Sequence, residues 1–143
     1  MKFKYVSFYF LCIMLLLGNQ NSFKIKSKYK HLKLIDEWVF ISMETITRND
    51  EDERELVMQD KNNVETLSFH RSGSMSYVSM KNGKEKKGRG LWLIKDENIR
   101  IIASIDTIDA TYSIENGILT LTTSEQESEE FYGYTSVVKY KNK

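Results

Sequence analysis

The sequence predicts an all-β fold, an antiparallel up-and-down meander of eight or nine strands that closes into a small barrel. Apolar and polar side chains alternate with a period of two along most of the chain, as they do in half-buried strands. Asn82-Gly83 and Asn116-Gly117 are typical of two-residue hairpin turns, because both residue types accept positive φ. The segments between the expected strands are too short for a crossover helix, so neighbouring strands should pair antiparallel.

Composition limits the classes of protein to consider. A chain of 143 residues has material for one domain, and 41% apolar with 12% aromatic residues is typical of a folded protein. The 21 basic and 20 acidic residues nearly balance. Proteins that bind nucleic acids usually carry a strongly basic face, so the composition argues against a nucleic-acid partner.

The first 22 residues have the layout of a secretory signal peptide. Lys2 and Lys4 precede a mostly apolar run over residues 5–17, and small or polar residues follow over 18–22. A helix of this run, rising about 1.5 Å per residue, would not cross roughly 30 Å of hydrocarbon. We therefore expect a signal peptide over 1–22, a secreted or periplasmic protein and no stable membrane span after signal removal. An uncleaved helix and a single N-terminal anchor are the alternatives.

The chain has one cysteine, Cys12, in the middle of that apolar run. A lipoprotein signal would place its cysteine after the run, behind small residues, so a lipid anchor is not expected. Removal of the signal leaves no thiol for a disulfide or for cysteine chemistry. The exported domain must then be stable from its core alone.

Residues 23–33 form a basic leader with five lysines, and the barrel domain is predicted over residues 34–143. We expect a solvated leader that ends in a short helical turn or an extended strand end. The alternative is a cationic arm that contacts an acidic surface such as lipid head groups.

In chain order, the strands are expected over residues 36–47, 55–59, 64–70, 74–81, 86–95, 98–105, 109–115, 118–124 and 130–140. Near Trp38 and Val39 both faces of the first strand carry apolar side chains, so it should be covered on both sides there. Residues 49–55 are rich in carboxylates but lack the glycine and the distant glutamate of an EF-hand loop. We expect a solvated loop there and no metal site.

The expected strands cannot remain one flat sheet. A sheet of this size in a domain this small would leave an apolar face in water, whereas closure buries that face and removes the edges. Gly73, Gly83 and Gly117 are assigned to the hairpin turns, and Gly90 and Gly133, inside strands, mark bends or bulges.

Three short pieces resemble a lipocalin-like, calycin-type domain of small secreted bacterial proteins. They are residues 34–38 with Trp38, residues 67–69 with Gly73, and residues 90–94 before Asp96. The family usually has a glycine where this chain has Asp36. The resemblance implies an up-and-down barrel of about eight strands, with Trp38 plugging one end and a ligand cavity at the other. The resemblance implies no catalytic residues in this chain.

The first functional hypothesis is a secreted, non-enzymatic binding protein for a small apolar ligand. Barrels of about eight strands are only just wide enough for side chains, so the same inward aromatics would also serve as a filled core. Arg100 or His70 would select the ligand through polar contacts. The candidate ligand-binding residues are one parity of the strands: Phe69, Tyr77, Trp92, Ile101, Tyr112, Leu121 and Tyr134.

The alternative hypothesis is a protein–protein interaction module of the cell envelope with a filled barrel. Acidic residues gather in segments 49–55 and 124–130, and basic residues gather in segment 81–89. Complementary patches of this kind steer association with an envelope or secreted protein partner.

An enzyme is not expected. The chain has two histidines, His31 in the leader and His70 beside a turn, and a catalytic triad would have to depend on His70. Two distant histidines and no mature cysteine also leave a zinc site without ligands. We predict no catalytic residue, no metal and no cofactor.

Overall fold

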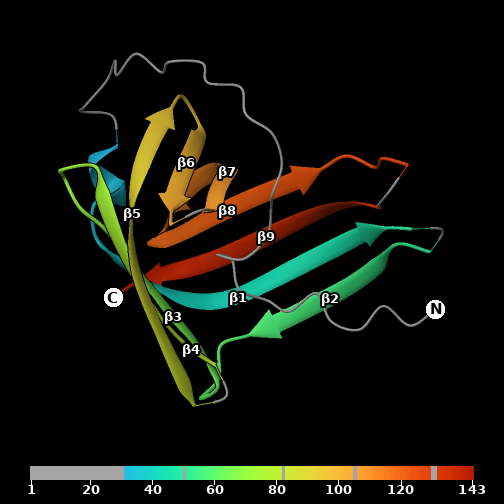
Figure 1. Ribbon diagram of the computed structural model, residues 1–143, viewed down its shortest axis with the longest axis horizontal. Helices are drawn as coiled ribbons and strands as arrows, with labels where there is room; N and C mark the ends of the chain where they lie inside the picture. The colour runs from blue at the N-terminus through green and yellow to red at the C-terminus, as the bar shows by residue number, and fades with distance from the viewer. Residues whose placement is uncertain (1–30, 50, 82, 105, 130–131) are drawn as a thin grey trace.

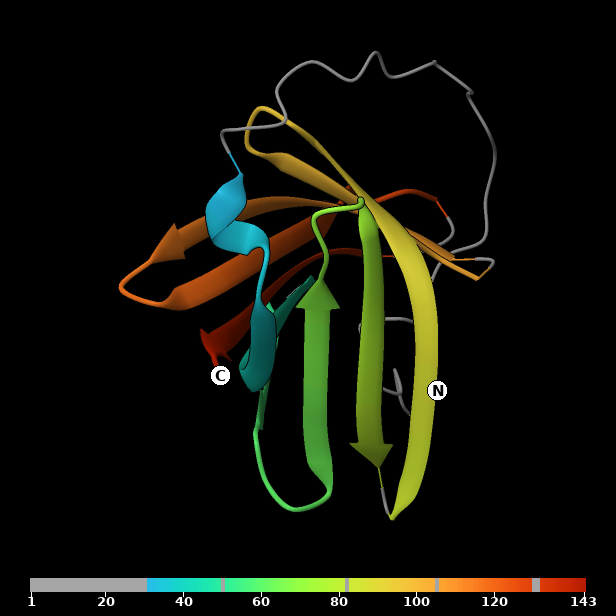
Figure 2. The same ribbon diagram turned by 90° about the vertical axis from the view of Figure 1, so that its left-hand side faces the viewer.

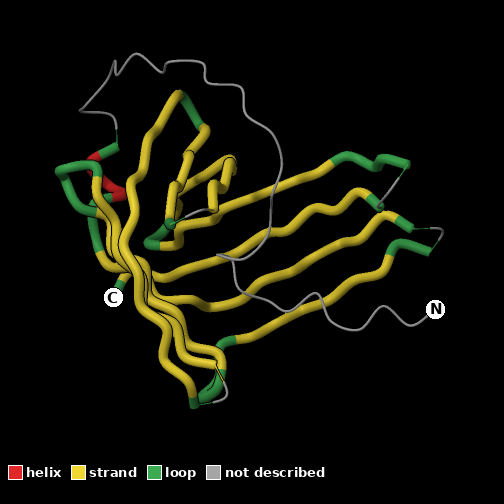
Figure 3. Tube along the Cα trace, viewed as in Figure 1, coloured by secondary structure: helices red, strands yellow, loops and turns green. Residues whose placement is uncertain are grey.

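The computed structural model describes residues 31–49, 51–81, 83–104, 106–129 and 132–143. The predicted signal peptide, 1–22, and residues 23–30 of the leader lie outside the described residues. The described part is nearly all strand, with one 3-10 turn (Figure 3). The elements are η1 (Leu32–Leu34), β1 (Glu37–Arg48), β2 (Glu53–Met58), β3 (Asn63–Phe69), β4 (Ser74–Lys81), β5 (Lys84–Lys95), β6 (Asn98–Ala103), β7 (Asp106–Glu115), β8 (Ile118–Glu125) and β9 (Gly133–Asn142).

The strands form a closed antiparallel barrel, which confirms the predicted fold class. From β3 to β9 each strand pairs with the next in sequence, and β9 pairs with β1 along almost its whole length. β1 also pairs with β3, which completes an eight-stranded ring. β2 is an extra strand, attached to β1.

The prediction that neighbouring strands pair is wrong at one place: β2 and β3 do not pair with each other but share one edge of β1. β3 pairs with Glu37–Val39 of β1, and β2 pairs with the part of β1 from Ser42 to Thr47. Both run antiparallel to β1, so together they act as one long strand interrupted at residues 59–62. The register between β1 and β9 shifts between Phe40 and Ser42, which marks a bulge at the same level.

The interruption divides the barrel wall into two arms (Figure 1). We call β1, β2, β8 and β9 the β1 arm, and β3, β4 and the first half of β5 the β4 arm. In Figure 1 the two arms diverge from the region where β1 meets β3, and Figure 2 shows β3, β4 and β5 side by side.

The closed end of the barrel is filled by apolar side chains. Trp38 is 1% exposed, and its Nε1 donates to the carbonyl oxygen of Leu34 in η1 at 2.9 Å. Phe69 meets Trp92 edge to face, with ring centroids 5.9 Å apart. Alternate residues of the surrounding strands, such as Ile101 and Leu121, complete this core. That Trp38 plugs one end of the barrel stays a prediction from the resemblance.

The turns follow the sequence signals closely. Gly73, Gly83 and Gly117 all have positive φ, which glycine adopts at no steric cost. The strand boundaries differ from expectation by up to three residues: β2 begins at Glu53, inside the predicted 49–55 loop, β7 begins at Asp106 rather than at residue 109, and β9 begins at Gly133 rather than at residue 130.

Candidate functional site

Four of the predicted ligand-binding residues form the packed core. Phe69, Tyr77, Ile101 and Leu121 are buried and belong to one apolar cluster. Their inward orientation follows the alternation along the strands, and their side chains pack together inside the barrel. Ligand contact by these four residues stays a prediction, and none of the four lines either of the two hollows described below.

The other three predicted residues occupy separate places. Trp92 packs against the core, and its Nε1 donates to the carbonyl oxygens of His70 at 3.1 Å and Ser74 at 3.0 Å. Tyr112 hydrogen-bonds to Nδ1 of His31 and borders a hollow of about 380 Å³ beside the β5–β6 turn. Tyr134 lies half-buried at the start of β9. The structure does not bring the seven residues together around one cavity.

The two residues suggested for polar selection lie away from the interior. Arg100 forms a bidentate ion pair with Asp109, at 2.6 Å and 2.8 Å, and both side chains have substantial exposure. His70 is exposed at the β3–β4 turn, with its Nε2 3.4 Å from the hydroxyl of Ser76.

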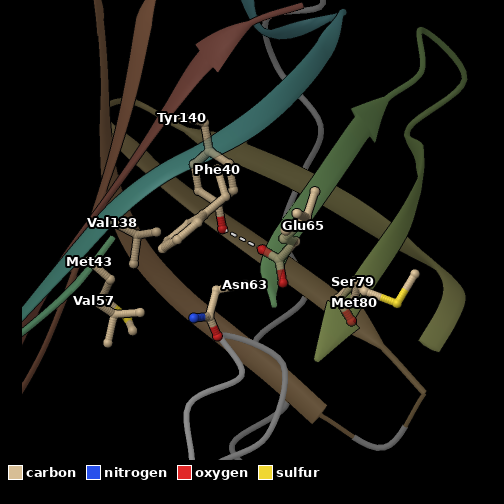
Figure 4. Close-up of a pocket in the computed structure, with 10 residues that line it drawn as sticks. Phe40, Met43, Val57, Asn63, Glu65, Ser79, Met80, Val138 and Tyr140 are labelled. Carbon is tan, nitrogen blue, oxygen red and sulfur yellow. Dashed lines mark hydrogen bonds between the residues drawn. The ribbon is translucent and has the colours of Figure 1, made fainter. Parts of the chain in front are cut away.

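A hollow lies where the wall is interrupted, between the two arms (Figure 4). It has a volume of about 50 Å³. Figure 4 shows side chains from both arms facing this space. Its lining is mainly apolar around one carboxylate: Phe40, Met43, Val57, Asn63, Val64, Glu65, Ser79, Met80, Val138 and Tyr140.

Local pairing explains why space remains at this place. Residues 59–65 have only Phe40 and Ile41 opposite them on β1, because β2 ends at Met58 and β3 rejoins β1 at Thr66. The first residues of β3 therefore leave β1 and follow β4 instead. Val57, Asn63 and Met80 are only half-buried, which places the mouth of the hollow between β2 and the start of β3.

The polar centre of the hollow is a hydrogen-bonded pair, Glu65 and Tyr140. The Tyr140 hydroxyl donates to Oε1 of Glu65 at 2.6 Å, across 75 residues of sequence (Figure 4). Glu65 is 9% exposed and Tyr140 is fully buried. The ring of Phe40 meets that of Tyr140 edge to face, with centroids 6.0 Å apart, so two aromatic rings flank the carboxylate side of the hollow.

Burial changes the ionisation of both groups. It raises the pKa of the Glu65 carboxyl, because an apolar surrounding disfavours the charged form, and the hydrogen bond from Tyr140 offsets part of that rise. Burial and the nearby carboxylate raise the pKa of the Tyr140 hydroxyl well above its usual value. Tyr140 therefore acts as a hydrogen-bond donor, and Glu65 remains able to accept further hydrogen bonds.

The sequence contained a signal for this site. Asn63, Glu65, Leu67 and Phe69 share one parity of β3, so a carboxylate occupies a position that the alternation assigns to the interior. Charged residues are almost never buried without a partner, which makes such a position a candidate site. Its partner Tyr140 had been placed in the closing strand, with no indication that the two would meet.

No protein-family model and no curated protein matches the sequence. Among the described residues, no cluster of three or more histidine, cysteine, aspartate or glutamate side chains is arranged to hold a metal ion. The same part of the chain contains no helix that is long and apolar enough to cross a membrane. The barrel is compatible with a lipocalin-like fold.

Proposed function

We propose that this is a non-enzymatic, lipocalin-like binding protein that takes one end of a small ligand into the hollow at the interruption of its wall. One observation carries the proposal: the apolar hollow with a single buried carboxylate lies where both arms contribute side chains. Concave, mostly apolar spaces with a few convergent polar groups are the usual form of small-molecule sites.

The size of the hollow limits what enters it. A buried water requires about 10–15 Å³ of such space, so about 50 Å³ holds roughly four atoms of that size. A complete fatty ligand does not fit, and the closed end of the barrel is filled. The ligand end that enters is short, and the remainder extends through the mouth between β2 and β3.

The lining favours binding over catalysis. The described residues around the hollow include no histidine, and His70 lies at the β3–β4 turn. Met43, Val57 and Val138 supply apolar contacts, while Glu65 and Tyr140 fix the orientation of one polar group. Together with the signal-like start of the sequence, this supports a secreted or periplasmic carrier of a small molecule.

The first test uses three four-carbon probes: butanol, butylamine and butyrate. Methyl signals of Met43, Val57 and Val138 are followed by NMR as each probe is added to the wild-type protein. We expect at least one probe to shift these signals in a saturable manner. Val57→Phe, which fills the hollow, should reduce the affinity for that probe at least tenfold.

Val78→Phe is the matched control, since Val78 lies on the outer side of β4 and is 40% exposed. It should leave probe binding within twofold of the wild-type value. If none of the three probes shifts the lining methyl signals, the proposed function is wrong. If a probe binds, native mass spectrometry of protein purified from its own host identifies the natural ligand by its added mass.

A second candidate function, an interaction module of the cell envelope, is favoured by β2. This strand pairs with β1 on one edge and forms the end of the sheet, while Leu56 and Met58 are 64% and 53% exposed on its outer face. Edge strands with exposed apolar side chains are ready sites for pairing with another chain.

The charges at the ends of the arms add to this second candidate. Thr47 pairs with Tyr134, so the acidic β1–β2 turn and the acidic loop before β9 lie together at the end of the β1 arm. The basic β4–β5 turn lies at the end of the β4 arm (Figure 1). A pull-down from the native host, at low and moderate salt, should recover a protein partner. The Leu56→Lys variant should no longer recover this partner, and the Val78→Lys variant should still recover it. Recovery of nothing above background excludes this second function.

A further inference from the structure

The carboxylate in the hollow is built to accept hydrogen bonds from outside the protein. Tyr140 donates to Oε1, and an ionised carboxylate has about four acceptor positions on its two oxygens. Burial and the hydrogen bond from the Tyr140 hydroxyl are the influences that shift the pKa of Glu65. The ion pairs of the described chain, such as Arg54–Glu44, lie on exposed side chains elsewhere.

A charged group in such a place is costly unless a counter-charge joins it. Transfer of an ion out of water carries a penalty that a well-placed partner of opposite charge offsets. A protein that retains Glu65 inside an apolar hollow therefore favours a ligand that brings positive charge. The neighbouring residues fit the same chemistry, since Phe40 and Tyr140 both line the hollow and an aromatic ring attracts a cation that lies over its face within about 6 Å of its centre.

We propose that the hollow selects a primary ammonium group carried on a short aliphatic chain. The ammonium lies against Glu65, beside the rings of Phe40 and Tyr140, and the first carbons contact Met43, Val57 and Val138. This inference rests on the proposed function, because it assigns the ligand class of the same site. The room for roughly four atoms fits an ammonium nitrogen and about three carbons.

The test compares the dissociation constants of butylamine, butanol and butyrate, measured by the same NMR titration in low salt at pH 8. Wild-type protein should bind butylamine at least tenfold more tightly than butanol, and butyrate should bind most weakly. Glu65→Gln retains the shape of the side chain and removes its charge. It should weaken butylamine binding at least tenfold and leave butanol binding within twofold.

Glu129→Gln is the matched control, since it removes one negative charge from the exposed loop before β9. It should leave all three affinities within twofold of the wild-type values. If Glu65→Gln does not fold, the wild-type comparison of the three probes decides by itself. Butanol binding as tightly as butylamine, or full butylamine binding by folded Glu65→Gln, overturns the ammonium proposal.

The two proposals fail in different ways. Saturable binding of butanol with no preference for butylamine supports the proposed function and contradicts the proposal that the ligand carries an ammonium group. Absence of binding by every probe removes both.

Discussion

At the scale of the residue, Glu65 is the position where the chain departs from its own pattern. The inward parity of β3 otherwise carries Leu67 and Phe69, which pack in the core. Glu65 shares that parity and is almost as deeply buried. A carboxylate removed from water carries a desolvation penalty, which the hydrogen bond from Tyr140 offsets in part.

The raised pKa of Glu65 makes the stability of the protein depend on pH. Below about pH 4.5 the carboxyl is protonated in both folded and unfolded states. As the pH rises, the unfolded state ionises first, so the folded state loses stability until the pH passes the folded pKa of Glu65. The slope in this window is at most about 1.4 kcal/mol per pH unit.

We therefore expect the free energy of unfolding of wild-type protein, relative to Glu65→Gln, to fall as the pH rises above about 4.5 and then to level off. Urea denaturation of both proteins between pH 4 and pH 8 measures this difference. Glu129→Gln should show no such trend relative to wild type. A constant difference between wild type and Glu65→Gln would contradict the burial effect.

At the scale of the element, two glycines of β5 allow close approaches that shape the barrel. A Cβ at Gly88 would lie 2.3 Å from the ring of Tyr77, which packs across the glycine. A Cβ at Gly90 would lie 2.3 Å from the carbonyl oxygen of Ile102 on β6. Neither glycine has positive φ, so the requirement at both positions is for space and not for backbone freedom.

Alanine should be worse at Gly90 than at Gly88. A tyrosine ring can rotate or shift, whereas the Ile102 carbonyl is fixed in the β5–β6 pairing. We expect Gly88→Ala to cost about 1–3 kcal/mol, the usual range for overpacking, and Gly90→Ala to cost more. Chemical denaturation ranks the two variants.

A Tyr77→Leu background separates the two causes. Removal of the Tyr77 ring should restore most of the stability lost in Gly88→Ala and little of the stability lost in Gly90→Ala. Equal recovery at both positions would contradict the contacts described for these glycines.

At the scale of the whole molecule, the barrel is unequally held. β8 lies between β7 and β9 and is paired along both edges. β2 is paired with β1 and ends the sheet, and most of its side chains are exposed. Local opening is easiest where few apolar contacts oppose it.

Hydrogen exchange should show this difference. We expect the amide protons of β2 to exchange at least about tenfold faster than those of β8, because β2 opens without unfolding the ring. Native-state exchange measured by NMR provides the comparison. Protection of β2 equal to that of β8 would contradict the assignment of β2 as an attached edge strand, and protection that appears only at high protein concentration would indicate pairing with a second chain.

Sequence reasoning reached the fold because its signals are local. The period-two alternation assigned Phe69, Ile101 and Leu121 to the inner face, and the structure places them in the core. The Asn-Gly turns and Gly73 fixed where strands begin and end to within a few residues, because only some residues adopt positive φ. The same signals could not identify the candidate site, because period two gives the face of a residue and not its depth along the barrel.

By itself, the sequence determined an all-β chain, its strands, its turns and the side of each strand that faces inward. Tertiary structure alone decided that β2 and β3 share one edge of β1, that the wall opens where they part, and that Tyr140 reaches Glu65 there. The physical reason is that alternation and turn chemistry act over neighbouring residues, whereas pairing partners, register and curvature depend on the packing of the whole sheet around its core.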